Sequence, residues 1–194
     1  FMTATKTLNG LTPSRMRGGG ANSTGSSVYN IASGYADNIF TGDVVVNTAG
    51  GNVNVQLSAT DEALGVFMGC RYTAPNGTPT WSSYWPSGTV SSDAKAMVID
   101  NPAATYLIQA DTSVTIGDLN SFNFEVTLGA GSTVTGKSGF GLEAGTRATT
   151  KNMLRIVGLY DIPGNEITSA FPIVEVRLNQ HVDSFVSAGT SVTP

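Results

Sequence analysis

The chain has 194 residues, of which 12% are charged, 23 are glycine, one is cysteine and one is histidine. Its formal charge is −4 and it has no basic run, so it lacks the electrostatic footprint of a protein that binds nucleic acid or an anionic membrane. With one histidine and one cysteine, the chain has few side chains that could bind a metal or act as a nucleophile. These totals favour a binding or structural role over catalysis.

The first 27 residues have little apolar periodicity. Residues 18–27 are all Gly, Ala, Ser, Thr or Asn and cannot bury enough surface to fold alone. Directly before them lies Ser14-Arg15-Met16-Arg17, which holds two closely spaced arginines. We expect residues 1–27 to form an extended arm, either disordered in the free protein or ordered by a partner. Arg15, Met16 and Arg17 are then candidate contacts.

From residue 28 onward the two-residue hydrophobic period of β-strands takes over. Three stretches alternate cleanly, namely 53–57, 122–128 and 173–178. The last of them places Glu175 and Arg177 on one face and its valines on the other. More continuously apolar runs predict buried strands, at 44–46, 64–72, 96–99, 106–109 and 153–160. Only single helical turns are expected, near residues 61–64 and 115–119.

Turns rich in Pro, Gly and Asn separate these runs, as in Pro75-Asn76-Gly77 and Pro163-Gly164-Asn165. We therefore predict eight to ten strands. The predicted fold is all-β, a jelly-roll-like sandwich or barrel with an extended N-terminal arm. Residues 28–194 are expected to form one β-rich domain, since a chain of this length can bury a core without disulfides or metals.

Both tryptophans lie in the segment Trp81-Ser82-Ser83-Tyr84-Trp85-Pro86. If exposed, its rings can stack on sugars or fill a pocket on a partner protein; if folded back, they anchor the segment on the protein's own core. We favour the self-packed or protein-interface interpretation, because a sugar site usually also has carboxylates or amides nearby and the local sequence offers only Asn76. Trp81, Tyr84 and Trp85 are therefore candidate contacts.

Residues 131–138, Gly-Ser-Thr-Val-Thr-Gly-Lys-Ser, match the pattern of a phosphate-binding P-loop. A P-loop needs a helix that begins at its Gly-Lys-Ser, so that backbone N–H groups converge on the phosphates. Here Gly139, Gly141 and Gly145 follow, and each costs about 1 kcal/mol relative to alanine in a helix. We predict a Gly/Thr turn at this place, and no nucleotide site.

The remaining reactive residues select no catalytic arrangement. Cys70 lies in an apolar run and is predicted to be a small buried hydrophobe. No G-x-S-x-G motif is present to supply a nucleophile for His181, which we expect to be a polar surface or interface residue. The 14 acidic residues are scattered and single out no carboxylate pair. We expect no enzymatic activity, no metal and no cofactor.

Several stretches, taken in order, are distinctive. They are residues 29–45, 84–89, 98–102, 107–111, 154–160, 163–166 and 176–181, and include Tyr84-Trp85-Pro86-Ser87-Gly88-Thr89 and Val176-Arg177-Leu178-Asn179-Gln180-His181. Together they resemble the capsid decoration, or cement, proteins of tailed bacteriophages. The resemblance covers roughly residues 28–181 and includes no diagnostic chemical group.

The resemblance implies a structural virion protein that sits on the outer surface of the expanded capsid. Such a protein binds the major capsid protein, as a homotrimer, and clamps neighbouring capsomers; neither nucleic acid nor a membrane is its partner. The leading alternative is a carbohydrate-binding or host-adhesion module, such as a head fibre or tail-tip domain. That alternative predicts saccharide binding that depends on Trp81 or Trp85.

Overall fold

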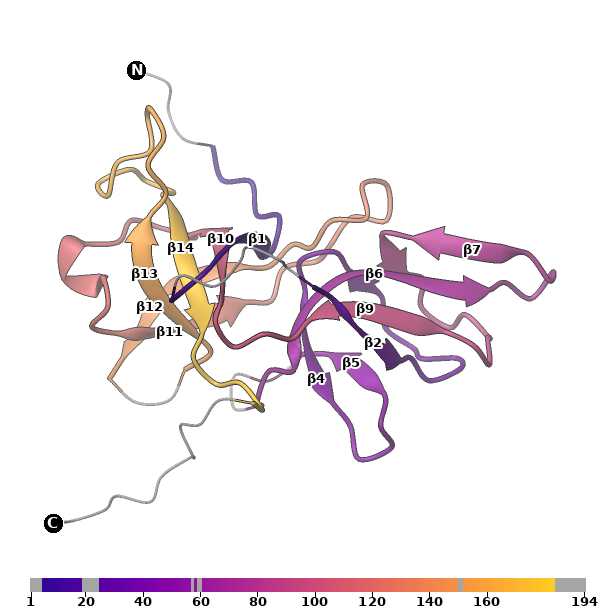
Figure 1. Ribbon diagram of the computed structural model, residues 1–194. Helices are drawn as coiled ribbons and strands as arrows, with labels where there is room; N and C mark the ends of the chain where they lie inside the picture. The colour runs from indigo at the N-terminus through magenta and orange to yellow at the C-terminus, as the bar shows by residue number, and fades with distance from the viewer. Residues whose placement is uncertain (1–4, 19–24, 57, 59–60, 150–151, 184–194) are drawn as a thin grey trace, which may run out of the picture.

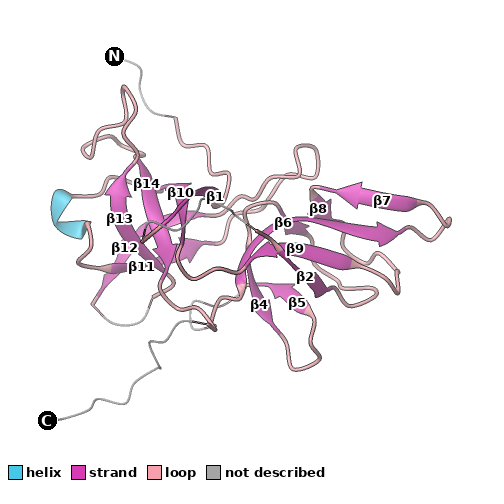
Figure 2. Cartoon of the chain, viewed as in Figure 1, coloured by secondary structure: helices cyan, strands magenta, loops and turns pink. Residues whose placement is uncertain are grey.

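A computed structural model of the chain describes residues 5–18, 25–56, 58, 61–149 and 152–183 (Figure 1). Within these ranges it contains 14 β-strands and a single 3-10 turn, η1 (Ile116–Asp118), so the all-β prediction is confirmed (Figure 2). The turn η1 falls where residues 115–119 predicted one. The turn expected at 61–64 is absent, because Ala63 instead forms an extended bridge to His181.

Sheet A has six antiparallel strands in the order β1-β10-β14-β13-β11-β12. Their bounds are β1 (Thr12–Met16), β10 (Ala104–Gln109), β14 (Ile173–Leu178), β13 (Leu154–Leu159), β11 (Asn123–Thr127) and β12 (Gly141–Ala148). Strand β14 has the predicted alternation: Val174 and Val176 are fully buried in the core, and Glu175 and Arg177 lie on the opposite face.

Sheet B has the order β2-β9-β6-β4-β5, and β7 pairs with the second half of β6. Its strands are β2 (Ser27–Asn30), β9 (Lys95–Ile99), β6 (Gly65–Thr73), β4 (Val44–Asn47), β5 (Val53–Val55) and β7 (Pro79–Ser82). Two short strands, β3 (Ile39–Phe40) and β8 (Tyr84–Trp85), pair with each other. Because β6 is nine residues long, it can pair with β4 at its start and with β7 at its end.

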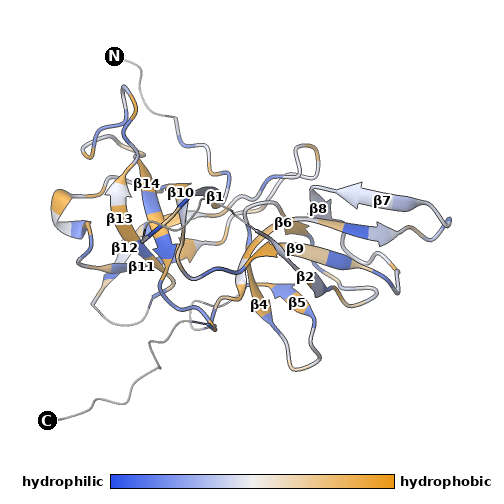
Figure 3. Ribbon diagram, in the orientation of Figure 1, coloured by the Kyte–Doolittle hydropathy of each residue, from blue (hydrophilic) through white to orange (hydrophobic). Residues whose placement is uncertain are grey.

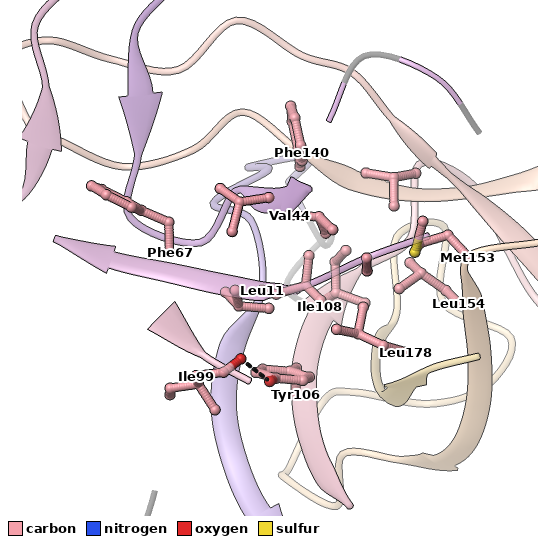
Figure 4. Packing of buried hydrophobic residues seen from close by; sticks show 14 of the residues in the cluster. Leu11, Val44, Phe67, Ile99, Tyr106, Ile108, Phe140, Met153, Leu154 and Leu178 are labelled. Carbon is pink, nitrogen blue, oxygen red and sulfur yellow. Dashed lines mark hydrogen bonds between the residues drawn. The ribbon is translucent and has the colours of Figure 1, made fainter. Parts of the chain in front are cut away.

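One hydrophobic core joins the two large sheets. Val44 and Phe67 of sheet B pack in the same cluster as Ile108 of sheet A, together with Leu11 and Phe140 (Figure 4). The sheets are therefore packed as parts of one domain, in agreement with an all-β sandwich. These strand orders do not establish the jelly-roll arrangement, which stays a prediction.

Backbone hydrogen bonds reinforce the place where the sheets meet, which we call the junction (residues 9–11, 41–43 and 136–140). Leu11 N–H donates to the Gly42 carbonyl (2.9 Å), and Gly42 N–H donates to the Phe67 carbonyl (2.9 Å). Gly10 has a φ of 72°, and a Cβ there would lie 2.5 Å from the Cβ of Ser138, so only glycine fits this close approach.

Asp43 is the one acid at the junction. It is 2% exposed, and its carboxylate accepts a hydrogen bond from the Phe40 N–H (2.7 Å). Burial raises the pKa of this carboxyl from 3.8 to about 6, against the opposing effect of hydrogen bonds from Ser138 and Phe40.

The N-terminal segment differs from the predicted arm. Residues 12–16 form β1, the edge strand of sheet A, and Leu11 is 1% exposed in the core. The part of the segment up to Arg17 therefore belongs to the β domain, which does not begin at residue 28. Its strand escaped prediction because Pro13 and the polar residues around it obscure any alternation. Residues 1–4 and 19–24 of the expected arm lie outside the described residues.

Candidate interaction surfaces

The aromatic segment divides into a buried and an exposed part. Trp85, in β8, is fully buried, and its ring packs edge-on against Tyr72 with centroids 5.2 Å apart. Its prediction as a contact residue is wrong, because no surface of its side chain can reach a partner or a sugar. Tyr84 is half-buried and stacks on Phe40 with centroids 5.5 Å apart.

Trp81 is the exposed member of the segment. It lies on β7, with 70% of its surface exposed, directly opposite Arg71 on β6. The Arg71 guanidinium carbon is 6.0 Å from the centre of the Trp81 ring, a cation–π contact. We call residues 71–82 the Trp81 hairpin. In Figure 1, β7 lies at the end of sheet B farthest from sheet A.

The outer face of sheet A carries a row of cross-strand partners. Arg15 of β1 is opposite Thr105 of β10, which is opposite Arg177 of β14, which is opposite Arg155 of β13. Directly opposed residues project to the same side of a sheet, and Figure 3 shows hydrophilic stretches along β14. Arg17 follows β1 and donates its N–H to the Ala103 carbonyl. We call Arg15, Arg17, Arg155 and Arg177 the arginine face.

Arg15 has a partner within the fold. Its Nε and Nη2 each donate to a Glu175 carboxylate oxygen at 2.7 Å, and Thr105 Oγ1 donates to the same carboxylate at 2.6 Å. The Arg15 side chain is 67% exposed, whereas that of Glu175 is 8% exposed. These hydrogen bonds, led by the one from Arg15, lower the pKa of the Glu175 carboxyl.

Among the described residues, the other three arginines of the face have no carboxylate partner. The two ion pairs among the described residues are Arg15–Glu175 and Arg147–Asp118, and neither includes them. Arg155 donates to the Asn120 carbonyl, whereas Arg177 Nε is buried with no hydrogen-bond partner. Burial, followed by the positive charges of Arg155 and Arg17, lowers the pKa of Arg177.

A shallow hollow of about 360 Å³ opens beside these arginines, and we call it the arginine hollow. It is lined by Arg17, Gly18, Pro102, Ala103, Thr105, Arg177 and Asp183. Guanidinium groups present several N–H donors in a planar fork, which suits carboxylate or phosphate oxygens. Met16, the third predicted arm contact, is instead partly buried against the core, so its side chain contributes little to this surface.

The P-loop-like residues form a turn, as predicted. Gly136 N–H donates to the Ser132 carbonyl at 2.7 Å, and Ser138 is 2% exposed at the junction. The next element is the strand β12, so the helix that a phosphate site needs does not follow. The segment closes a loop against β3 through the bridge between Thr41 and Lys137.

His181 is buried, which corrects the expected surface position. It is 4% exposed, because the extended residues around Ala63 cover it: Ala63 N–H donates to the Gln180 carbonyl and Val182 N–H donates to the Ala63 carbonyl. Burial lowers the pKa of His181. Cys70 is fully buried, as predicted, and burial raises the pKa of its thiol to about 12.

Within the described ranges, no three histidines, cysteines or acids are grouped to hold a metal ion. The same ranges contain no helix with the length and hydropathy of a membrane span. Comparison of the chain with protein-family models, with curated proteins and with solved structures gave no match.

Proposed function

We propose that this chain is a structural virion protein that binds the outer surface of an assembled phage capsid and links adjacent capsomers. The observation that carries the proposal is the presence of two separate exposed surfaces of different chemistry on one fold, each a candidate contact. The arginine face lies on sheet A, and the Trp81 hairpin lies at the far end of sheet B (Figure 1). Arginine and tryptophan are enriched in the energetically dominant parts of protein interfaces.

A protein that links two capsomers needs two separate contact surfaces. Two surfaces on a shared core are held at a fixed separation, so the second contact forms as an intramolecular event once the first is made. A protein that binds only the assembled lattice also stabilises that lattice by mass action. Each contact can then be ordinary in size, about 800 Å² per partner, and the shell still gains stability.

The resemblance to decoration proteins supports the capsid as the lattice in question. We accordingly propose the major capsid protein as the main partner and a homotrimer as the attached form. A trimer would multiply both surfaces around its axis and contact several capsomers at once. Neither nucleic acid nor a membrane has a part in this attachment.

The test is co-sedimentation of the purified chain with capsids assembled from the major capsid protein. We expect saturable binding to assembled capsids, no binding to dissociated capsid protein, and a higher temperature of capsid disruption. Trp81→Ala should weaken binding, whereas Val134→Ser, at an exposed position of the 131–138 turn, should not. Equal binding to dissociated subunits would contradict the proposal, and binding to saccharides without capsids would favour the adhesion alternative.

A further inference from the structure

We infer that the arginine hollow binds the carboxylate groups of an acidic protein segment, with Arg17 and Arg177 as the binding residues and Arg155 beside them. The inference extends the proposed function, since under that proposal the acidic segment belongs to the capsid protein. The ligand chemistry follows from the hollow itself and is testable without capsids.

The arginines are placed where their charges destabilise the folded sheet. Arg155 and Arg177 are directly opposite each other on β13 and β14, a position in which like charges destabilise a sheet. Arg177 is half-buried, with its Nε unpartnered, and Arg17 adds a third positive charge. Opposed arginines that lack a carboxylate partner among the described residues indicate an anionic ligand outside the fold.

The local charge fits a few carboxylates. The arginine face has four positive charges, which exceed by two the acids that pair with Arg15 or line the hollow, Glu175 and Asp183. Glu175 is already bound by Arg15, whereas Asp183 lies at the hollow and would repel a ligand with a dense run of phosphates. A nucleic acid carries a charge about every 1.7 Å of helix and needs a longer basic track. Two carboxylates match this excess of positive charge.

The edge of sheet A indicates how such a segment binds. β1 is an edge strand, but Pro13 has no N–H to donate, and the register shifts between Pro13 and Arg15. Proline and bulges are devices that prevent a further strand from adding to an edge. The partner is therefore bound by the guanidinium groups of the face, and its backbone does not extend the sheet.

The first test measures binding of a hexaglutamate peptide to the full chain at low salt by fluorescence anisotropy. The Arg17→Gln/Arg177→Gln variant should lose about tenfold in affinity, as expected when charge-assisted hydrogen bonds are removed. A control with the same change in charge, Lys6→Gln/Lys137→Gln, alters two exposed lysines elsewhere and should bind as the wild type does. Tripolyphosphate should bind more weakly than the peptide.

The second test repeats capsid co-sedimentation with the same variants. If the wild type and the lysine control bind and the arginine variant does not, the inference holds. If all three bind equally, the inference is overturned while the proposed function stands. If none binds capsids but the peptide binds through the arginines, only the proposed function fails. Tighter binding of tripolyphosphate than of hexaglutamate would overturn the carboxylate assignment.

Discussion

The outer face of sheet A and the hairpin at the end of sheet B support their exposed side chains in different ways. On sheet A, Arg155 and Arg177 oppose each other with no carboxylate between them. On sheet B, Trp81 is opposite Arg71, and their cation–π contact is favourable. The Trp81 hairpin needs no partner for its stability, whereas the opposed charges of the arginine face lower the free energy of unfolding. The arginine face is therefore the stronger indicator of binding.

The largest expected effect is a difference in stability between substitutions of the two tryptophans, Trp85 in β8 and Trp81 in β7. Trp85→Ala removes a fully buried ring and should lower the free energy of unfolding by about 3–5 kcal/mol. Trp81→Ala removes a ring that is 70% exposed, together with its cation–π contact, and should lower it by no more than about 1 kcal/mol. Urea denaturation followed by circular dichroism measures both. Similar losses for the two variants would mean that the Trp81 ring is part of the core and not a contact surface.

The second-largest expected effect is on the pH dependence of stability, and it comes from Asp43 at the junction between sheets A and B. The folded-state pKa of Asp43, about 6, lies above its ordinary value of 3.8, so its stabilising contribution is fully present below pH 3.8 and is lost as the pH rises through 6. This difference corresponds to at most about 3 kcal/mol. Asp43→Asn keeps an acceptor for the Phe40 N–H and removes the buried charge, so it should raise the stability at pH 7.

Thermal unfolding of the wild type and of Asp43→Asn between pH 4 and pH 7 tests this expectation. The difference in melting temperature between the two proteins should be largest at pH 7 and shrink toward pH 4. Subtracting the two curves removes the opposing contribution of Glu175, whose lowered pKa makes stability fall in acid. A constant difference across this range would show that Asp43 titrates normally in the folded protein.

The smallest effect tests the arginine face directly. Arg155→Gln removes one of two directly opposed like charges and should raise the free energy of unfolding by about 0.2–1 kcal/mol. Arg15→Gln is the matched change at the arginine that has a carboxylate partner, and it should lower stability. Urea denaturation at low salt gives both values. A loss of stability in Arg155→Gln would mean that the opposed arginines do not destabilise sheet A. The arginine face and the Trp81 hairpin would then not differ in the way described above.

The strands with strong hydrophobic alternation were predictable. Residues 173–178 matched β14 at both ends, because one side of this strand faces the core along its whole length. β1 and β7 were missed because they are short and rich in Ser, Thr or Pro, and β8 was missed because it has only two residues; backbone pairing with a neighbour holds all three in place. Such pairing depends on the tertiary structure and produces no hydrophobic alternation in the sequence.

The candidate contacts were predictable only in part, for the same reason. Trp81 and Trp85 are four residues apart and have the same parity, yet β7 pairs with β6 and β8 pairs with β3, so the two rings have different surroundings. Arg15 and Arg17 were singled out by their spacing. Their association with Arg155 and Arg177 depends on the order β1-β10-β14-β13, which joins residues more than a hundred positions apart.

The proposed attachment to a capsid lattice is tested most directly by the copy number of this chain relative to the major capsid protein in purified virions. Quantitative mass spectrometry of the particles supplies that ratio. We predict a ratio near one to one, as expected for a protein that links capsomers over the whole shell. A ratio of a few per hundred would contradict the proposal and place the chain at a fibre or tail position.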